Sequence, residues 1–350
     1  MSFTLQELEN ISNAALDYHM DRGQVFSSTI QAKPLLREMT NAASEFPSGK
    51  ENITVRVKGK YTTTIEGFEG DDSVSYGNPA NIKQASYPWK NIHWGIKVTM
   101  DELKKDGITI SDTTDGTGET RHSDREWTDL ANLLDDKIED MKEGAERGLN
   151  EMYWLDGSQD SKVIPGITSF IVSNPTAALN VGGIDQSVAA NSWWRNRANM
   201  AIAVGSDPGA QVLVNFLQQE FRQLRRYGSP KHIALCGSDF ISQLEKELRA
   251  KGNYTLDGWD KKGKMDISMA DISFKNVGFE YDPTLDDLSF ADQCFIIDMK
   301  AIFPKNMEGE YMKKHSPARP PEKYVIYRAV TMTGGLVCRQ RNTSGRYKLA

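Results

Sequence analysis

The histidines of this sequence are the first residues to test for acid–base or metal chemistry. There are five, and they fall one to a segment: His19, His93, His122, His232 and His315. Metal ligands in proteins usually come in closely spaced groups, so a site here would need several distant segments to converge. We expect surface or capping roles for these histidines, and no metal.

The three cysteines also point away from chemistry. Cys236, Cys294 and Cys338 are far apart, and the first two lie in the strand-like runs HIALCG and QCFIID. A thiol in such a run usually serves as a small buried apolar group. We expect all three cysteines to be reduced and structural.

Two short motifs could bind an ion or a phosphate, and each has a simpler explanation. The acidic segment DPTLDD, Asp282 to Asp287, could hold calcium only if ligands arrived from elsewhere, whereas a solvated loop needs no such coincidence. The Gly-x-Gly of DGTGET, residues 115–120, follows no strong strand, so we interpret it as a flexible turn. The sequence also lacks a Walker loop, an HExxH motif, paired CxxC motifs and a GxSxG elbow. It predicts no catalytic residue, no cofactor and no enzyme.

The composition is that of an ordinary globular protein. The 350 residues are 39% hydrophobic and 26% charged, a length comfortable for two interleaved domains. With 42 basic against 48 acidic residues, the chain is not built to grip a phosphate backbone. The start does not resemble a signal peptide, and no apolar run approaches the roughly 20 residues that span a bilayer. We expect a cytoplasmic chain without membrane contact.

The elements that must position any functional residue begin with an N-terminal arm, residues 1–45, in which Leu5, Leu8 and Ile11 start the apolar face of a helix. Alternation with a period of two then predicts strands over residues 53–57 and 92–98. The stretch 67–91 between them contains glycine, proline and aspartate but neither a helical nor a convincing strand period. A loop of this length is uncommon inside a compact domain, so we expect it to reach outside one.

The strongest local pattern predicts one long helix over residues 123–155. Ser123 and Glu126 match a capping box. Small or apolar residues recur every seven positions in two series: Trp127, Leu134, Met141, Gly148 and Ala131, Ile138, Ala145, Met152. About 32 residues at 1.5 Å each would run about 48 Å, longer than a compact domain of this size needs. Another element should therefore lie along this helix.

An α/β layer is expected farther along the chain. A helix that begins at the N-cap Asp207 and ends before Gly228, the strand HIALCG, and a helix from Ser238 to Gly252 follow in the order typical of such a layer. Further strands are predicted at DISFKNVGFEY, QCFIIDM, EKYVIYRAVTM and GLVCRQRN. We expect the last two to form a hairpin around Gly334 and Gly335.

The middle of the irregular stretch indicates a contact between chains. Phe68 lies between glycines and acidic residues, an odd choice for an exposed site unless its ring inserts somewhere. A lone hairpin with such a tip, and an arm with a polar face, bury little surface alone, so both should order on contacting other chains. Repeated contacts between different patches close rings or build lattices. Assembly is then the predicted function.

The order of these elements resembles that of the major capsid proteins of tailed double-stranded DNA bacteriophages. The sharpest local likeness is GITSFIVSNPTAALNVGGIDQSVAANSWWRN, residues 166–196, with its Gly-Ile start, Gly-Gly-Ile-Asp step and Trp-Arg-Asn element. The resemblance implies an α+β, HK97-like fold. Its parts would be an N-terminal arm (1–45), an extended loop with flanking strands (46–100), a peripheral domain (101–197 and 318–350) with a spine helix near 124–155, and an axial domain (198–317).

The resemblance also assigns contact residues in the loop. The tip with Phe68, Glu69, Asp71 and Asp72 would lie over an adjacent subunit, the alternative being a mobile surface hairpin. Some relatives join subunits covalently through a lysine and an asparagine. Lys58, Lys60 and Lys83 lie in the right region, but no residue pattern identifies that chemistry, so we predict no cross-link.

Further contact residues are implied after the spine helix. Gly182 and Gly183 would let the backbone turn tightly. Trp193 and Trp194, followed by Arg195, would anchor the domain junction or a neighbouring subunit, or fill this subunit's own core. We expect one indole to point inward and the other to be shared. Trp259 would lie in the segment 252–270, which resembles by position the loop at the centre of a hexamer or pentamer.

As an expectation from this resemblance, copies of the chain form hexamers and pentamers that self-assemble in the bacterial cytoplasm into the icosahedral shell of a virion. The partners would be other copies, a portal protein, a separate scaffolding or decoration protein where one exists, and packaged DNA in weak, non-specific contact. Three other functions stay open: an encapsulin-like shell around cargo enzymes, a cytosolic α/β enzyme with an inserted hairpin acting through the Asp282 to Asp287 region, and a tail-tube or minor structural protein.

Overall fold

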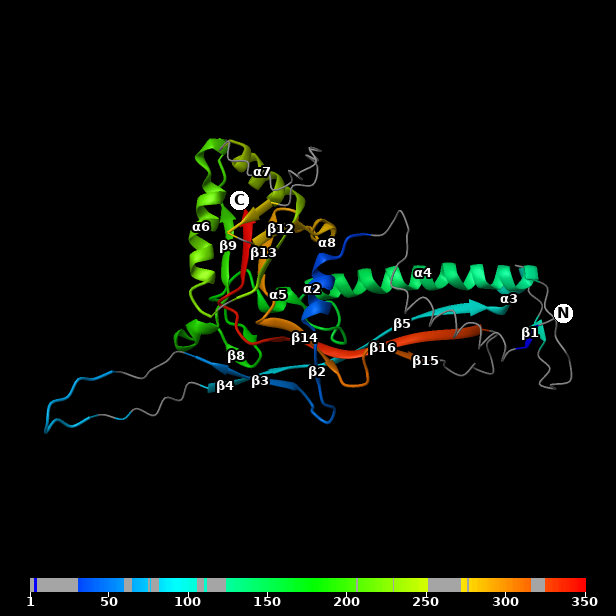
Figure 1. Cartoon of the computed structure of the whole chain (residues 1–350), viewed down its shortest axis with the longest axis horizontal. Coiled ribbons are helices and arrows are strands. Elements are labelled where there is room, and N and C mark those ends of the chain that lie inside the picture. Colours follow the sequence, from blue (N-terminus) through cyan, green and yellow to red (C-terminus); the bar gives the residue numbers. More distant parts are fainter. Residues whose placement is uncertain are drawn as a thin grey trace, which may run out of the picture. The chain divides into compact units, whose positions relative to one another are not determined.

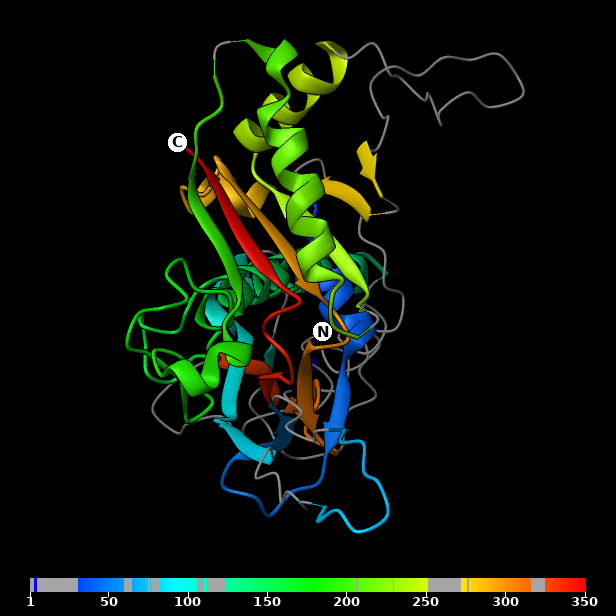
Figure 2. The same cartoon turned by 90° about the vertical axis from the view of Figure 1, so that its left-hand side faces the viewer.

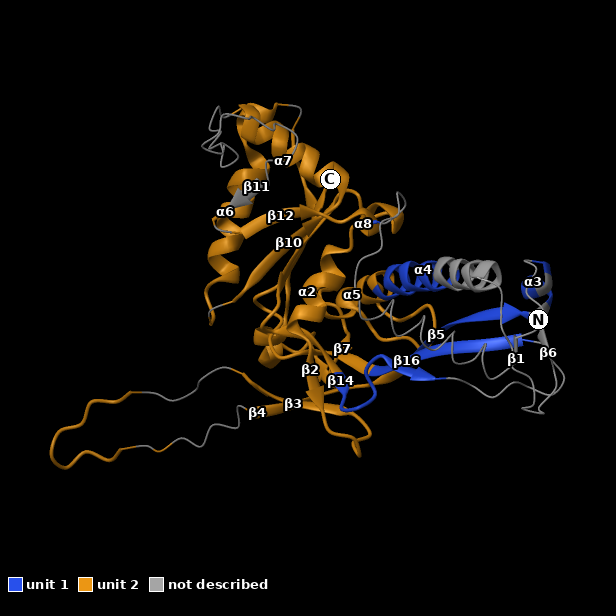
Figure 3. Cartoon of the chain, turned by 45° about the vertical axis from the view of Figure 1, so that its right-hand side comes forward, with its two compact units in different colours: residues 1–31, 91–149, 306–333 blue, residues 32–90, 150–305, 334–350 orange. Residues whose placement is uncertain are grey.

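The computed structural model describes residues 3–4, 31–59, 65–74, 76, 82–105, 110–111, 124–205, 207–228, 230–250, 272–275, 277–315 and 325–350. Contacts divide the chain into two compact units. Unit 1 consists of Met1–Gln31, Asn91–Leu149 and Asn306–Thr333, and unit 2 consists of Ala32–Lys90, Asn150–Lys305 and Gly334–Ala350 (Figure 3). The division into arm, loop, peripheral and axial domains was drawn from the family resemblance, not from these contacts, and it stays a prediction.

Unit 1 combines a long helix with a few strands (Figure 1). Its elements are β1 (Phe3–Thr4), β5 (Lys90–Thr99), α3 (Met100–Lys105), β6 (Ile110–Ser111), most of α4 (Asp124–Trp154), β15 (Lys313–His315) and the first part of β16 (Val325–Cys338). β1 pairs with β6, and β16 pairs with both β15 and β5. The predicted long helix is confirmed as α4, which begins one residue after Ser123.

The apolar side of α4 departs from the strict seven-residue repeat. Ile138 is buried, as predicted, but Gly148 is exposed and the next residue, Leu149, is buried instead. A straight α-helix drifts by about 20° per heptad against a period of 3.5 residues. The buried side of α4 therefore moves from the position of Gly148 to that of Leu149.

Unit 2 contains a six-stranded sheet, two covering helices and several smaller elements. The helices are α2 (Pro34–Ala42), α5 (Ile167–Phe170), η1 (Ala189–Trp194), η2 (Pro208–Ala210), α6 (Val212–Leu224), α7 (Ser238–Ala250) and α8 (Pro283–Asp287). The strands are β2 (Ser44–Phe46), β3 (Ile53–Lys58), β4 (Ile82–Tyr87), β7 (Asn180–Val181), β8 (Ile184–Asp185), β9 (Arg197–Ile202), β10 (His232–Cys236), β11 (Ile272–Phe274), β12 (Val277–Tyr281), β13 (Gln293–Asp298), β14 (Ile302–Met307) and β17 (Gly345–Leu349).

The six-stranded sheet has the order β11-β12-β10-β13-β17-β9 and carries the main core of unit 2. β10 lies parallel to β12 and antiparallel to β13, and β17 lies parallel to β9. α6 and α7 cover one face of it (Figure 2). Leu217 and Phe221 of α6 and Phe240 of α7 pack with Phe279 and Ile296 of the sheet, all at most 5% exposed. The expected α/β layer is confirmed.

α6 begins later than predicted. Asp207 does accept a hydrogen bond from the backbone N–H of Gly209, but it caps the short helix η2 rather than α6. Gln211 then adopts a left-handed conformation (φ 52°), and α6 starts at Val212 without a side-chain cap from its own N-terminal segment. An N-cap residue in the sequence indicates that a helix begins nearby. It does not tell whether that helix is the short η2 or the longer α6 that follows it.

The stretch 67–91 is not irregular throughout, so this prediction was wrong for its second half. Residues 82–87 form β4, which pairs antiparallel with β3 from Ile53 opposite Tyr87 to Lys58 opposite Ile82. Only Ala85 and Tyr87 of β4 are buried. Lysine and alanine are depleted in strands, so pairing with β3 and the burial of two side chains must outweigh the propensity of Lys83 and Ala85.

The hairpin expected around Gly334 and Gly335 is also wrong, because β16 runs without a break from Val325 to Cys338. A Cβ atom at Gly335 would lie 2.6 Å from the carbonyl oxygen of Pro88. The glycine therefore permits a close approach of two backbones instead of a turn. Conversely, the single strand expected at DISFKNVGFEY is a hairpin, β11 and β12, with Lys275 at φ 51° in its turn.

Several predictions lie outside the described residues. They include the arm helix over residues 5–16, the turn at 115–120, the segment 252–270 and the side chain of Leu134. In the part of the chain that the structure describes, no helix combines the length and apolar character needed to cross a bilayer.

Candidate functional site

The tip of the β3–β4 loop, defined here as residues 65–74 and Tyr76, is exposed throughout. It is held by a local turn in which the N–H of Asp72 bonds to the carbonyl of Glu69 (2.9 Å), and the N–H of Glu69 bonds to the carboxylate of Asp72 (3.0 Å). Phe68 is 66% exposed and Tyr76 is 93% exposed. The expected contact of this tip with an adjacent subunit stays a prediction.

The base of the loop is fixed to unit 2 through β3 and β4. Ile53 and Val57 of β3 share a buried face with Ala85 and Tyr87 of β4, while the intervening side chains are exposed or half-buried. Because side chains alternate between the faces of a strand, the β3–β4 pair buries one of its faces and exposes the other. Lys83 also donates a hydrogen bond to Asn191 of η1. The tip is thus carried by a well-anchored pair of strands.

Gly182 and Gly183 form the two-residue turn between β7 and β8. Both have positive φ, 62° and 79°, as the two central residues of a type I′ hairpin require. A Cβ atom at Gly182 would lie 2.9 Å from the ring of Tyr87, and the carbonyl of Gly182 accepts a hydrogen bond from the N–H of Ser86. The predicted tight turn is confirmed, and it packs against β4 of the same subunit.

The two adjacent tryptophans have different environments. Trp194 has no exposed surface, and its indole N–H donates to the carbonyl of Val181 (3.1 Å). Trp193 is half-buried, meets Trp194 edge to face at 5.5 Å, and lies against Gly59 at the end of β3. One indole therefore points inward, as predicted. Whether Trp193 is shared with a neighbour stays a prediction.

Arginine side chains hold the segment between β8 and β9 in place. Arg195 donates to the carbonyls of Gln186 and Ser187, both at 2.8 Å, so its guanidinium serves its own subunit. Arg341 is fully buried and donates to the carbonyl of Phe170 (2.7 Å), the side chain of Gln186 (2.9 Å) and the side chain of Asn196 (3.1 Å). Burial lowers the pKa of Arg341 to about 10. The group is thus a cation held by neutral acceptors.

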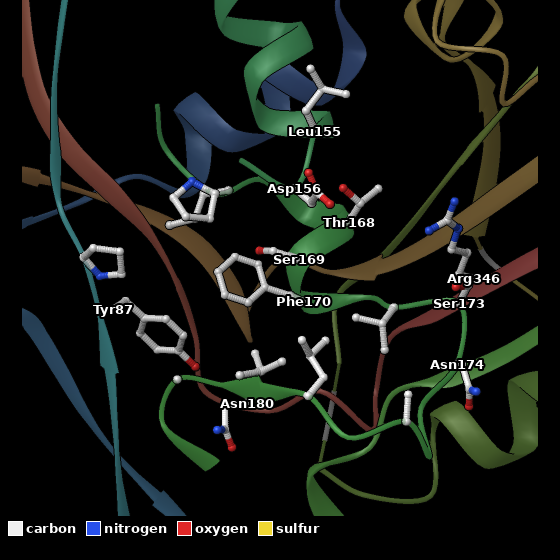
Figure 4. Close-up of a pocket in the computed structure, with 18 of the residues that line it drawn as sticks. Tyr87, Leu155, Asp156, Thr168, Ser169, Phe170, Ser173, Asn174, Asn180 and Arg346 are labelled. Atoms are coloured by element: carbon white, nitrogen blue, oxygen red, sulfur yellow. The ribbon is translucent and has the colours of Figure 1, made fainter. Parts of the chain in front are cut away.

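An open groove of about 720 Å³ lies beside this segment (Figure 4). Tyr87, Leu155 and Phe170 contribute apolar surface to it, and Asp156 and Arg346 supply its charges. Hydrogen bonds from the N–H and hydroxyl of Ser158 lower the pKa of Asp156. The guanidinium of Arg346 lies over the rings of Phe290 and Phe295, 5.1 Å from each centroid.

The chemistry available in this groove is limited. Its described lining includes no histidine, cysteine or lysine, so it offers neither an acid–base pair nor an activated nucleophile. The tyrosine hydroxyl of Tyr87 donates to the carbonyl of Cys338 (2.8 Å), and burial raises its pKa.

The acidic segment at Asp282 to Asp287 is structural in this subunit. Asp282 is buried, accepts hydrogen bonds from Trp154 (2.9 Å) and from the N–H of Thr284 (3.0 Å), and caps α8. Asp286 accepts from the hydroxyl of Tyr281 and the N–H of Ser238. Among the described residues no group of three or more histidines, cysteines or acids could hold a metal ion.

The structure brings together part of the predicted set. Gly182, Trp193, Trp194 and Arg195 lie in one region of unit 2, whereas Phe68, Glu69, Asp71 and Asp72 form the separate tip. Trp259 lies outside the described residues. Arg341 could not be predicted, because nothing in the segment RQRN indicates burial. Tyr87 could not be predicted, because the centre of its strand, Lys83 to Ser86, has weak strand propensity.

Comparison with known proteins places the fold. No protein-family model and no curated protein matches the chain. Solved structures do match over nearly the whole length. The chain is similar to a subunit of the capsid asymmetric unit of cyanophage A-1(L), with 14% identity and a TM-score of 0.61 over 93% of this chain and 94% of that one.

Two further matches agree with this one. A subunit from the capsid of a native GTA particle is 11% identical, with a TM-score of 0.55 over 94% of each chain. A subunit from the mature capsid of bacteriophage PhiM1 is 11% identical, with a TM-score of 0.55 over 94% of this chain and 90% of that one. The fold is therefore α+β and of the HK97-like class found in phage capsid proteins, as the sequence predicted.

Proposed function

We propose that this chain is a major capsid protein, whose copies form hexamers and pentamers that close into an icosahedral shell around phage double-stranded DNA. The observation that carries the proposal is the likeness to capsid subunits over 93% or more of the chain. A match of that extent includes residues of both compact units, not one common layer of secondary structure.

The described surface supports the same function. The tip exposes Ile65, Phe68 and Tyr76, which a subunit on its own leaves in water. The groove beside Phe170 and the tip are two different patches on one chain. Where one patch of a subunit binds a different patch of the next subunit, the contact can repeat from copy to copy until a ring closes. In this proposal the protein acts as a structural component of the virion.

The partners follow from this proposal. Copies of the chain are the main partner, a portal protein would occupy one vertex, and scaffolding or decoration proteins would join where the phage encodes them. Contact with the packaged genome would be weak and non-specific, because the net charge of −6 does not favour phosphate binding. Assembly would take place in the bacterial cytoplasm.

Electron microscopy of the expressed protein tests the proposal. We expect closed particles of uniform size from the chain alone or with its genomic neighbours, and DNA-filled particles with a tail vertex from native material. Small DNA-free shells filled with an enzyme would indicate a cellular compartment instead. A chain that stays monomeric at high concentration under all these conditions would overturn the proposal.

A further inference from the structure

Two cysteine thiols meet in the core of unit 2. Cys236 is the last residue of β10 and Cys294 is the second residue of β13, and the two are direct partners in the antiparallel register of these strands. Residues opposite each other in an antiparallel pair point to the same face of the sheet, and both cysteines belong to the core under α6 and α7. Their thiols are hydrogen-bonded to each other, and neither residue is exposed.

The backbone hydrogen bonds show which kind of pair the cysteines form. The N–H of Gly237 donates to the carbonyl of Gln293 at 3.0 Å. Hydrogen-bonded and non-hydrogen-bonded pairs alternate along an antiparallel ladder. Cys236 and Cys294, one step along from Gly237 and Gln293, are therefore a non-hydrogen-bonded pair, in which the Cα atoms are about 4.5 Å apart and the side chains are closest.

This pairing has the geometry that a disulfide needs. A disulfide joins residues whose Cα atoms are about 4.4–6.8 Å apart and whose side chains point toward each other, and the register provides both for Cys236 and Cys294. The third cysteine, Cys338, is also buried, but its thiol donates to the carbonyl of Gln340. It does not belong to the described core cluster that contains the other two. Cys338 is thus a natural internal control.

A metal ion is the other ligand that paired thiols could bind, and the surroundings of this pair do not favour one. A structural zinc site takes four protein ligands. Among the described residues, no group of three or more histidines, cysteines and acidic residues could hold a metal ion. The arrangement of Cys236 and Cys294 is therefore suited to joining their two sulfur atoms.

We propose that Cys236 and Cys294 form a disulfide between β10 and β13 when the protein meets a hydroperoxide such as hydrogen peroxide. One thiolate attacks an oxygen of the peroxide, the O–O bond breaks, and a sulfenic acid forms while the released hydroxide takes the thiol proton and leaves as water. The second thiol attacks that sulfur, the S–S bond forms and another water leaves. The two thiols lose two electrons and two protons, and hydrogen peroxide is reduced to two molecules of water.

Burial of the pair determines when this reaction occurs. The thiolate is the reactive form of a cysteine, and burial together with the hydrogen bond to Cys294 raises the pKa of the Cys236 thiol. Oxidation must therefore wait for brief openings of the core, and it does not compete with the reducing conditions of a cytoplasm. The disulfide would accumulate outside the cell. The reaction itself is independent of the proposed function, but this setting in a released virion rests on it.

The bond would join the two central strands of the six-stranded sheet. In the order β11-β12-β10-β13-β17-β9, β10 and β13 are the middle pair. Cys236 and Cys294 are about 60 positions apart, and a disulfide that closes a long loop restricts the unfolded chain more than one that closes a short loop. We therefore expect the oxidised subunit to resist unfolding better than the reduced one.

Peptide mapping of the full-length protein tests the bond directly, because trypsin places the cysteines in three different peptides, residues 232–246, 276–300 and 329–339. The folded protein would be treated with hydrogen peroxide, alkylated with N-ethylmaleimide in denaturant and digested without reductant. We expect peptide 232–246 linked to peptide 276–300, with the link lost in dithiothreitol, and peptide 329–339 alkylated. The linked protein should run as a monomer on a non-reducing gel.

Three results of this map would overturn the inference. The first is that both thiols of the pair stay free after oxidation for several days. The second is that Cys236 or Cys294 is oxidised alone to the sulfinic acid. The third is a disulfide that includes Cys338 or joins two copies of the chain.

Thermal unfolding of reduced and oxidised protein provides the second measurement. Oxidation should raise the unfolding temperature of the wild type by about 5 °C. Cys294→Ala removes one partner and should abolish this gain, whereas Cys338→Ala, the matched control at a buried cysteine outside the pair, should keep it. An equal gain in Cys294→Ala would contradict the inference. Circular dichroism checks the folding of each variant, and the peptide map of the wild type decides where a variant does not fold.

The outcomes separate this inference from the proposed function. If the protein forms no particles but the purified subunit forms the bond, only the proposed function fails. If particles form but the pair stays reduced in hydrogen peroxide, only the inference fails. Particles isolated from cells in the presence of N-ethylmaleimide should contain free thiols, and particles kept in hydrogen peroxide should contain the linked peptides.

Discussion

At the scale of single residues, the interior of unit 2 depends on two large polar side chains. The guanidinium of Arg341 lies 6.0 Å from the ring of Trp194, and both groups are fully buried. Arg341 spans segments that are far apart in sequence, since its acceptors belong to Phe170, Gln186 and Asn196. A buried polar group must keep all its partners, so this cluster fixes one arrangement of the loops around it.

The two tryptophans should differ in their effect on stability. Trp194→Ala should lower the free energy of unfolding by about 3–5 kcal/mol, because it leaves a large cavity and removes the buried hydrogen bond to the carbonyl of Val181. Trp193→Ala, at a half-buried position, should cost about 1 kcal/mol. Urea unfolding of unassembled protein measures both. Equal losses would contradict the difference in burial. A drop in particle yield with Trp193→Ala alone would support its expected role at an interface.

Residue-level prediction from the sequence succeeded where a local rule applies. Two adjacent glycines favour a tight turn with positive φ, and the structure has it at Gly182 and Gly183. No local rule could have found Arg341, because its burial depends on acceptors about 145 to 171 residues away in sequence.

At the scale of elements, the N-terminus of α6 is capped by a side chain of another helix. No side chain of its own N-terminal segment caps α6. The carboxylate of Glu247, on α7, instead accepts the N–H groups of Leu213 (3.1 Å) and Val214 (3.0 Å). Glu247 is 2% exposed, so this anion at a helix N-terminus also fixes how α6 and α7 pack together.

Removing this cap should weaken unit 2. Glu247→Ala should lower the free energy of unfolding by about 1–2 kcal/mol, the range for loss of a helix cap, and Glu247→Gln should cost less because one acceptor oxygen remains. Glu245→Ala is the control: this side chain is 40% exposed, pairs with Arg249 on the surface, and should change stability by less than about 0.5 kcal/mol. Thermal unfolding compares the three. A control loss as large as that of Glu247→Ala would rule out the capping role.

Helices and strands with a strong hydrophobic period in the sequence were predicted well. Strands that form because they pair with a distant segment were not. The bounds of α4 agreed with the prediction to within one residue at each end, although its buried side departs from the strict repeat. β4 was missed because the residues between Ile82 and Tyr87 show no strand pattern when taken alone, and β16 was cut in two because glycines usually mark turns. In both cases long-range pairing, invisible in one sequence, decided the outcome.

At the scale of the whole molecule, the order of elements was enough to predict the fold. The arm, loop, long helix and α/β layer together indicate the HK97-like class, and the matches to solved capsid structures confirm that class. The assembly contacts themselves stay predictions, because a contact between copies leaves only indirect signs in one chain, such as the exposed ring of Phe68.

Shortening the tip should separate folding from assembly. Replacing residues 67–73 by two glycines should leave the circular dichroism and the unfolding temperature of the subunit unchanged, because every residue removed is exposed. Closed particles should no longer form, since the lost contacts lie between chains. Electron microscopy measures this, with Val188→Ala, an exposed apolar residue outside the tip, as the control. Intact particles from the shortened protein would refute the assigned role of the loop.

The position of β17 in the six-stranded sheet bears on how this protein is made. β17 (Gly345–Leu349) lies between β13 and β9, so two strands translated much earlier wait for the segment that joins them. On the ribosome, a nascent chain can form α6, α7 and part of the sheet, but β13 and β9 have no strand between them until β17 has been translated. The six-stranded sheet is therefore completed only after β17 is made, and a subunit that lacks β17 leaves the facing edges of β13 and β9 without this partner.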